Sequence, residues 1–102
     1  MAERFTLLGS TASLEDVADA CGRVLGRAPE LHDSDYFGEY YRWELGAGWE
    51  IDVKRNVKDD DGSPYEPDFS DWPVLVYESG ATDPDSALRD IEGLELLRDE
   101  WL

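Results

Sequence analysis

Two neighbouring segments with strand periodicity constrain the fold of this chain more than any other feature of its sequence. Tyr36–Leu45 is rich in aromatic residues, and Trp49–Val57 alternates apolar with polar side chains. The three residues between them, Gly-Ala-Gly at 46–48, suit a tight hairpin loop. An antiparallel β-hairpin is therefore predicted. Its outward parity is a mixed, acidic and aromatic set made up of Tyr40, Arg42, Glu44, Glu50, Asp52 and Lys54.

The segments that flank the hairpin predict two further strands and two helices. Arg4–Gly9 and Pro73–Glu78 are short apolar runs bounded by turn residues, as is typical of strands. A helix is predicted after Ser13, a favourable N-cap, and is expected to stop at Gly26. Thr82–Leu102 is predicted to be the second helix. Its apolar stripe would comprise Leu88, Ile91, Leu94, Leu97 and Trp101.

The predicted elements define one small α+β domain. A length of 102 residues fits a single core, so residues 1–102 are assigned to one domain. The element order is β-α-β-β-β-α, with Pro29–Asp35 as a polar loop. The simplest architecture is an antiparallel sheet of three to four strands with both helices packed on one face. The other face of the sheet would then stay at least partly open.

The charge balance limits the partners of such a domain. The chain has 25 acidic and 9 basic residues, for a formal net charge of -16. This charge disfavours nucleic acid and anionic membrane surfaces, and it attracts and steers a basic protein. The alternative, that the acidity only keeps the protein soluble, agrees with the composition equally well. The like charges also favour a monomer or a weak homodimer.

The inventory of reactive side chains argues against common catalytic and metal centres. His32 is the single histidine, and Cys21, the single cysteine, falls on the apolar face of the first predicted helix. A catalytic pair of Cys21 and His32 is conceivable, but a buried cysteine is usually inert, so no catalytic residue and no cofactor are predicted. One cysteine permits no internal disulfide, and no leader or membrane span is evident, which predicts a cytoplasmic protein. The stretch 32–35 (His-Asp-Ser-Asp) could contact a metal, but short polar loops of this kind are usually only solvated.

The acidic stretch from Asn56 to Pro73 raises the question of calcium. When Gly62 is set at the sixth position of an EF-hand loop, the first position is Val57, which has no ligand side chain. The twelfth is Asp68, which is too short for the usual bidentate contact, and strands rather than helices are predicted on both sides. An irregular calcium site remains an alternative. The favoured interpretation is a semi-ordered acidic arm that contacts a partner, with a solvated connector as the close alternative.

These observations predict a small acidic protein-binding module that engages a basic partner through an acidic and aromatic surface. Immunity proteins that inhibit nuclease toxins have this size and composition, although no motif here identifies such a family. The alternative is a small enzyme or ligand-binding domain with a pocket between sheet and helices, where His32 and nearby acids would supply the polar groups. The candidate partner-binding residues are Asp33, Asp35, Tyr36, Tyr40, Glu44, Glu50, Asp52, Asp59, Asp60, Asp61, Tyr65 and Trp72.

Overall fold

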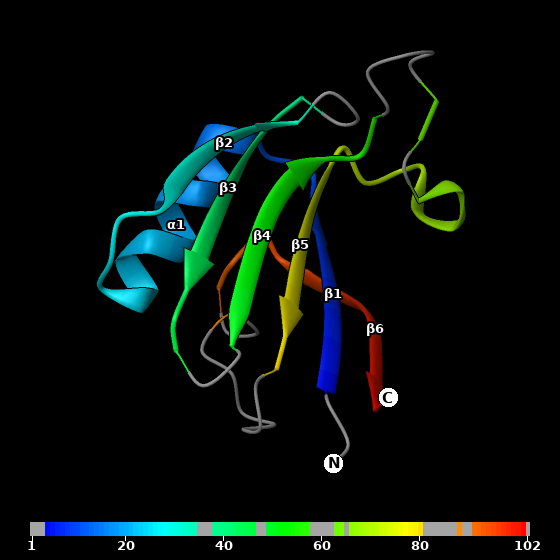
Figure 1. Cartoon of the computed structure of the whole chain (residues 1–102). Coiled ribbons are helices and arrows are strands. Elements are labelled where there is room, and N and C mark those ends of the chain that lie inside the picture. Colours follow the sequence, from blue (N-terminus) through cyan, green and yellow to red (C-terminus); the bar gives the residue numbers. More distant parts are fainter. Residues whose placement is uncertain are drawn as a thin grey trace.

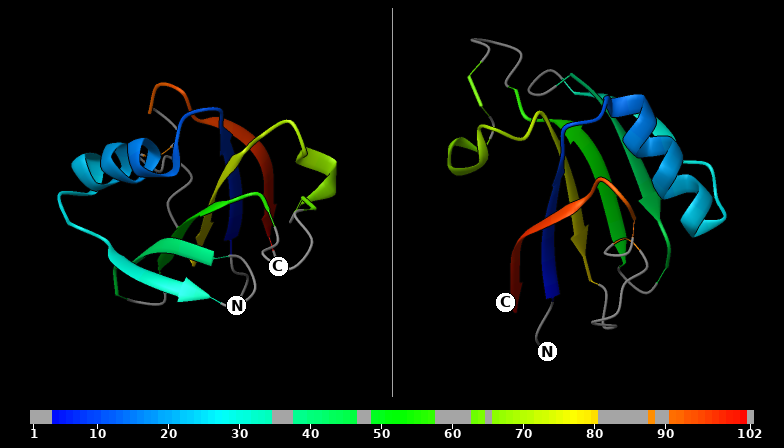
Figure 2. Two further views of the ribbon diagram at one scale, coloured as in Figure 1. Left: turned by 90° about the horizontal axis from the view of Figure 1, so that it is seen from above. Right: turned by 180° about the vertical axis from the view of Figure 1, so that it is seen from behind.

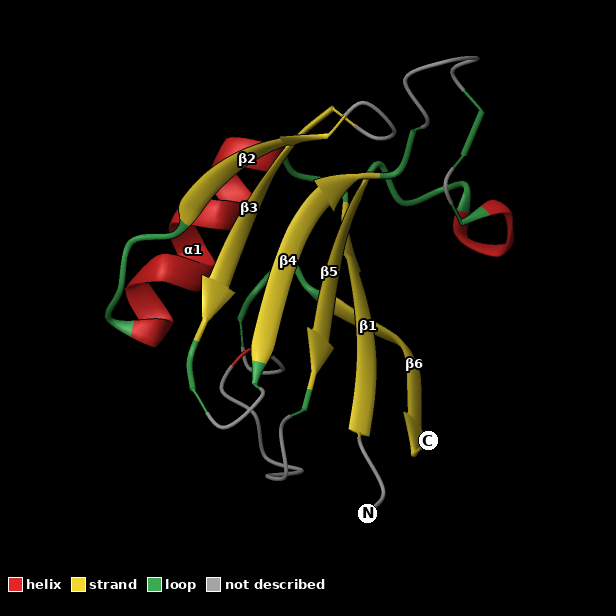
Figure 3. Cartoon of the chain, viewed as in Figure 1, coloured by secondary structure: helices red, strands yellow, loops and turns green. Residues whose placement is uncertain are grey.

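The computed structural model describes residues 4–34, 38–46, 49–57, 63–64, 66–80, 88 and 91–101. Within them the chain forms six strands, one α-helix and one short 3-10 helix (Figures 1 and 3). In chain order these are β1 (Arg4–Ser10), α1 (Leu14–Leu25), β2 (Glu30–Ser34), β3 (Gly38–Glu44), β4 (Glu50–Arg55), η1 (Pro67–Phe69), β5 (Val74–Ser79) and β6 (Glu95–Trp101).

One antiparallel sheet organises the whole domain. Its strand order is β2-β3-β4-β5-β1-β6, so β1 lies between two strands from the far end of the chain. Helix α1 covers one side of the sheet, behind β2 and β3 in the view of Figure 1 and in front in the right panel of Figure 2. The expectation of three to four strands and two helices on one face is therefore wrong, because within the described residues six strands accompany a single α-helix.

The main core lies between α1 and the sheet. Its helical side chains are Leu14, Val17, Ala18 and Cys21, and its strand side chains include Leu8, Trp43, Ile51, Val53, Val74 and Val76. The predicted caps of α1 are confirmed. Ser13 Oγ accepts a hydrogen bond from the Asp16 backbone N–H at 3.1 Å, and Gly26 ends the helix with a left-handed φ of 69°. Local signals therefore set both ends of α1, and its apolar face sets its position.

Two ionisable side chains that the structure describes, Glu78 and Cys21, are buried on the α1 side of the sheet. Glu78 is only 2% exposed, and its carboxylate accepts a hydrogen bond from Trp49 Nε1 at 2.9 Å. Cys21 is fully buried, as predicted, and this burial, with the nearby Glu78 carboxylate, raises the pKa of its thiol to about 12. The thiol therefore remains protonated and unreactive in the folded protein.

The predicted hairpin is confirmed as β3 and β4. The antiparallel register pairs Tyr41 with Val53 and Trp43 with Ile51, all on the α1 side of the sheet. The Leu45 N–H donates to the Trp49 carbonyl at 2.9 Å, which closes the turn next to Gly46. Gly46 has a φ of 87°, a conformation that L-residues with a side chain rarely adopt. Strand β5 confirms the expectation for Pro73–Glu78, shifted by one residue.

The segment predicted to be a polar loop, Pro29–Asp35, contains a strand instead. Residues Glu30–Ser34 form β2, whose regular antiparallel register with β3 runs from Glu30 opposite Arg42 to Ser34 opposite Gly38. The sequence Glu-Leu-His-Asp-Ser has little strand propensity of its own. Its conformation comes from backbone pairing with the aromatic strand β3, which no pattern within β2 reveals.

The second predicted helix is also corrected. Glu95–Trp101 is strand β6, which pairs with β1, while residues 82–87, 89, 90 and 102 of the predicted helix lie outside the described residues. Two turn hydrogen bonds, from Ile91 N–H to Leu88 O and from Leu94 N–H to Ile91 O, precede the strand. Gly93 then has a φ of 91°, which is incompatible with a right-handed helix. The helical spacing of Leu88, Ile91 and Leu94 nevertheless places all three against the main core.

None of the helices within the described residues combines the length and the apolar character that a membrane crossing requires.

Candidate binding face

The side of the sheet away from α1 carries the polar parity of the hairpin. The register places Tyr40 opposite Lys54, Arg42 opposite Asp52 and Glu44 opposite Glu50. Strand β2 adds Glu30 opposite Arg42 and His32 opposite Tyr40. We call this surface the open face, defined by Glu30, His32, Tyr40, Arg42, Glu44, Glu50, Asp52 and Lys54.

Arg42 is the best-held cation of the open face. Its Nε lies 2.8 Å from Asp52 Oδ1 and its Nη2 lies 3.1 Å from Asp52 Oδ2, a bidentate pair that is part-buried. Glu50 approaches the same guanidinium at 3.3 Å, and the Tyr40 ring lies 5.3 Å from it. The hydrogen bond to Asp52 raises the pKa of Arg42 above its ordinary value. The charge of Arg42 is therefore permanent, and three neighbours fix its orientation.

Lys54 is the second cation, and it is far more buried than an outward-facing lysine would be. Its side chain lies on the open face but the residue is only 7% exposed. The ammonium group lies 4.5 Å from the centroid of the Tyr77 ring on β5. Burial lowers the pKa of Lys54, against the attraction of Asp52. Lys54 is therefore engaged within the fold rather than presented to solvent.

His32 lies at the β2 end of the same face. Its ring stacks on Tyr40 with 5.2 Å between the centroids, and its Nε2 lies 3.3 Å from Glu30 Oε2. Asp33 is the next residue along β2, so it points to the α1 side of the sheet. Within the stretch 32–35, His32 and Asp33 therefore point to opposite faces of the sheet and do not form one site. Among the described residues, no group of three histidine, cysteine or acidic side chains is arranged to hold a metal.

A second feature covers the same side of the sheet at the β5-β1-β6 end. We call residues Glu66–Pro73, which include η1, the strap. Asn56 is 6% exposed, and its side chain binds the strap at three points: Oδ1 accepts from the Glu66 N–H at 2.7 Å, and Nδ2 donates to the carbonyls of Phe69 at 2.9 Å and Glu66 at 3.4 Å. The Asn56 backbone N–H also donates to the Pro73 carbonyl at 2.9 Å. Tyr77 Oη donates to the Glu66 carboxylate at 2.8 Å.

Aromatic side chains complete the attachment of the strap. The Trp72 ring lies so close to Gly9 that an added Cβ there would stand 2.9 Å from it, and 2.8 Å from Leu97. The Arg98 guanidinium lies 5.3 Å from the Phe69 ring centroid. The end of the predicted acidic arm is thus fixed on the sheet. Phe69 and Trp72 supply these aromatic contacts.

The predicted partner-binding residues occupy different places. Tyr40, Glu44, Glu50 and Asp52 lie together on the open face, Asp33 lies on the α1 side of β2, and Trp72 is half-buried in the strap. Asp35, Tyr36, Asp59, Asp60, Asp61 and Tyr65 lie outside the described residues. Sequence reasoning missed Glu30, Leu31 and Tyr77. The first two fall in the segment predicted to be a loop, and Tyr77 falls in the apolar run predicted to be the strand Pro73–Glu78.

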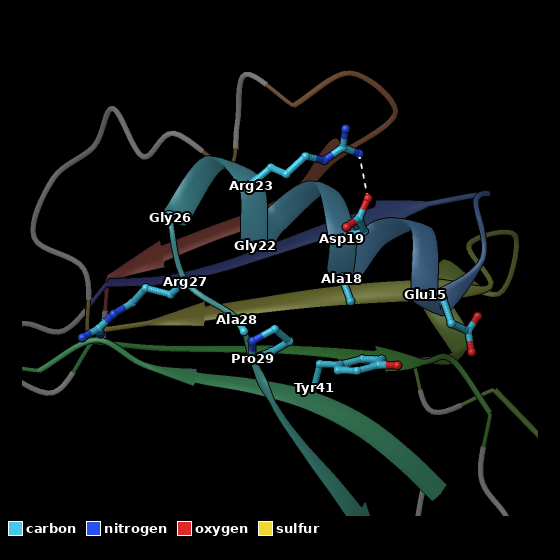
Figure 4. Close-up of a pocket in the computed structure, with 10 residues that line it drawn as sticks. All are labelled: Glu15, Ala18, Asp19, Gly22, Arg23, Gly26, Arg27, Ala28, Pro29 and Tyr41. Carbon is cyan, nitrogen blue, oxygen red and sulfur yellow. Dashed lines mark ion pairs between the residues drawn. The ribbon is translucent and has the colours of Figure 1, made fainter.

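A groove lies on the other side of the sheet, between α1 and the β2-β3 margin (Figure 4). Its volume is about 490 Å³, and its lining includes Ala18 and Gly22 of α1, Pro29, and Tyr41 of β3. The exposed pair of Arg23 and Asp19, 3.0 Å apart, lies along its helical rim. His32 is on the opposite face, so it does not combine with this groove into one polar site.

Comparisons with known proteins give no family for this chain. No family model matches it, and no curated protein shows significant similarity to it.

Proposed function

We propose that this protein is a binding module for a basic protein and that it inhibits that partner by covering a basic surface. The observation that carries the proposal is the state of the charges on the open face. Its two cations are already engaged, Arg42 by Asp52 and Glu50, and Lys54 by Tyr77. Glu30 and Glu44 remain exposed beside them. The face therefore offers exposed carboxylates on β2 and β3, of which Glu30 also contacts His32 at 3.3 Å.

This arrangement suits recognition of cationic side chains. Exposed carboxylates steer a basic partner toward the face, and a tyrosine ring adds contact area at low entropic cost. The ion pair with Arg42 holds Asp52 in place before binding, and the His32 ring and the Arg42 guanidinium hold Tyr40, which reduces the ordering that association requires. A nuclease inhibitor in the cytoplasm is the form of this function that we favour, since a basic nuclease carries a surface complementary to a chain with a net charge of -16.

The test is capture of partners from the source cell's lysate at low and at high salt, followed by an activity assay of any basic nuclease recovered. We expect recovery at low salt, loss as the salt concentration rises, and inhibition of the nuclease by the purified protein. Glu44→Lys should weaken capture, whereas Glu92→Lys, the same charge change at an exposed turn away from the open face, should weaken it less. Failure to retain any basic protein at low salt would overturn the proposal.

The groove supports a second candidate, a small ligand-binding domain or enzyme. Its volume of about 490 Å³ falls within the range of small-molecule sites. A fragment screen monitored by amide chemical shifts would test this candidate. Binding that shifts Gly22 and Tyr41 would favour it, and a screen without binders at these residues would count against it.

A further inference from the structure

We propose that the basic partner binds by adding an extended segment to the free edge of β2. The partner segment would place cationic side chains next to Glu30 and Asp33 and an apolar side chain next to Leu31. This inference rests on the proposed function, because it assumes a basic partner, and it names the element and the mode of binding.

Among the strands that the structure describes, one side of the β2 backbone has no neighbour. Their order begins with β2, which pairs with β3 alone (Figure 2, left panel, where β2 lies at the outer margin). In an antiparallel ladder, alternate residues direct their N–H and C=O groups away from the neighbouring strand. A strand edge of this kind is a template for another extended chain.

The two edge strands of the sheet, β2 and β6, differ in how well they suit the addition of a further strand. At the other edge, the pairing of β6 with β1 contains a register shift between Leu7 and Leu8. Such an irregularity twists an edge and protects it from further pairing. The pairing of β2 with β3 continues without a shift from Glu30 to Ser34, so β2 presents the more regular edge.

The side chains of β2 define the occupant. Leu31 is 56% exposed, although it sits opposite Tyr41, one of the residues that line the groove. Glu30 is largely exposed on the open face, and Asp33 is exposed on the α1 side. Proteins often protect edge strands with charges, but charges of one sign also select the charge of what binds. Two copies of β2 would bring acids together, whereas a basic segment would pair with them.

The complementary segment follows from the antiparallel register. Read from its own N-terminus, it has a cation opposite Asp33, any residue opposite His32, an aliphatic residue opposite Leu31 and a cation opposite Glu30. The probe is therefore a blocked synthetic peptide with the core Lys-Thr-Val-Lys between threonines. Two further versions carry N-methyl groups on alternate residues, one version for each parity. Methylation removes backbone donors and leaves the charge of the peptide unchanged.

The experiment is a titration of the isotope-labelled protein with each peptide at low salt, followed through amide chemical shifts. We expect changes centred on Leu31, His32 and Asp33, with one methylated version binding and the other not. Asp33→Lys and Leu31→Glu should each weaken binding by about fivefold or more, with the amide spectrum showing that both variants are folded. Glu92→Lys is the matched control.

Several results would overturn the inference. These are no binding of the unmodified peptide, equal binding of both methylated versions, or shifts centred on Tyr40 and Arg42 instead of β2. Changes at β2 that depend on protein concentration without peptide would identify a second copy as the occupant. Lysate capture distinguishes failure of this inference from failure of the proposed function. If capture succeeds and is unaffected by Asp33→Lys and Leu31→Glu, only the strand-addition mode is refuted.

Discussion

Replacing Asn56 with alanine should release the strap from the sheet. The side chain makes two short hydrogen bonds to the strap backbone, at 2.7 Å to the Glu66 N–H and at 2.9 Å to the Phe69 carbonyl, and a longer one to the Glu66 carbonyl. A net contribution of about 1 kcal/mol for each short bond is ordinary, and a part-buried backbone group left without a partner adds a further penalty. We therefore expect a loss of about 2–4 kcal/mol in the free energy of unfolding.

Urea denaturation followed by far-UV circular dichroism measures this loss, and hydrogen exchange of the Glu66 amide reports the strap directly. Ser70→Ala, at an exposed position within the strap, is the control and should change stability by less than about 0.5 kcal/mol. The reasoning is refuted if the Asn56→Ala midpoint coincides with that of Ser70→Ala while the Glu66 amide keeps its protection. In that case the aromatic contacts of Phe69 and Trp72 hold the strap without Asn56.

Three other substitutions test separate contacts. Gly9→Ala should cost about 1–3 kcal/mol, since its Cβ would meet Leu97 and Trp72 at 2.8–2.9 Å; thermal denaturation measures this, and an unchanged midpoint would contradict the packing. Trp49→Phe should cost about 1–3 kcal/mol by removing a donor from the buried Glu78, and a change as small as that of Ser70→Ala would argue against this hydrogen bond. Cys21 should resist thiol reagents until the protein unfolds, because burial raises its pKa from 9.0 to about 12. The unfolded thiol ionises first, so between these pH values the wild type should lose about 1.4 kcal/mol per pH unit relative to Cys21→Ala, with no such difference below pH 9; parallel urea titrations would show it.

Elements with local signals could be predicted from the sequence. Ser13 and Gly26 mark the ends of α1 because an N-cap hydroxyl and a left-handed glycine act within one turn of the helix. The β3-β4 hairpin was equally accessible, since its alternation and its Gly-Ala-Gly loop lie within one continuous stretch. The alternation also predicted correctly which hairpin side chains lie on the open face: Tyr40, Arg42, Glu44, Glu50, Asp52 and Lys54.

Elements that depend on distant partners could not be predicted in this way. Strand β2 owes its conformation to pairing with β3, and β6 to pairing with β1, while their own residues are polar or spaced as in a helix. The contacts of the strap also join residues far apart in the sequence, such as Trp72 with Gly9. Arg42 and Lys54 were placed on the correct face, but the engagement of Arg42 by Asp52 and of Lys54 by Tyr77 required the register of three strands.

The central position of β1 has a consequence for how the chain folds during synthesis. Ser10 pairs with Val74 on one side, and Arg4 pairs with Trp101 on the other. Both neighbours leave the ribosome long after β1, while α1 and the β2-β3-β4 meander can form from sequence-local contacts. Until β5 and β6 have been synthesised, both edges of β1 therefore remain unpaired and its leucines remain exposed. A high contact order of this kind slows folding and leaves the nascent chain open to association with other chains.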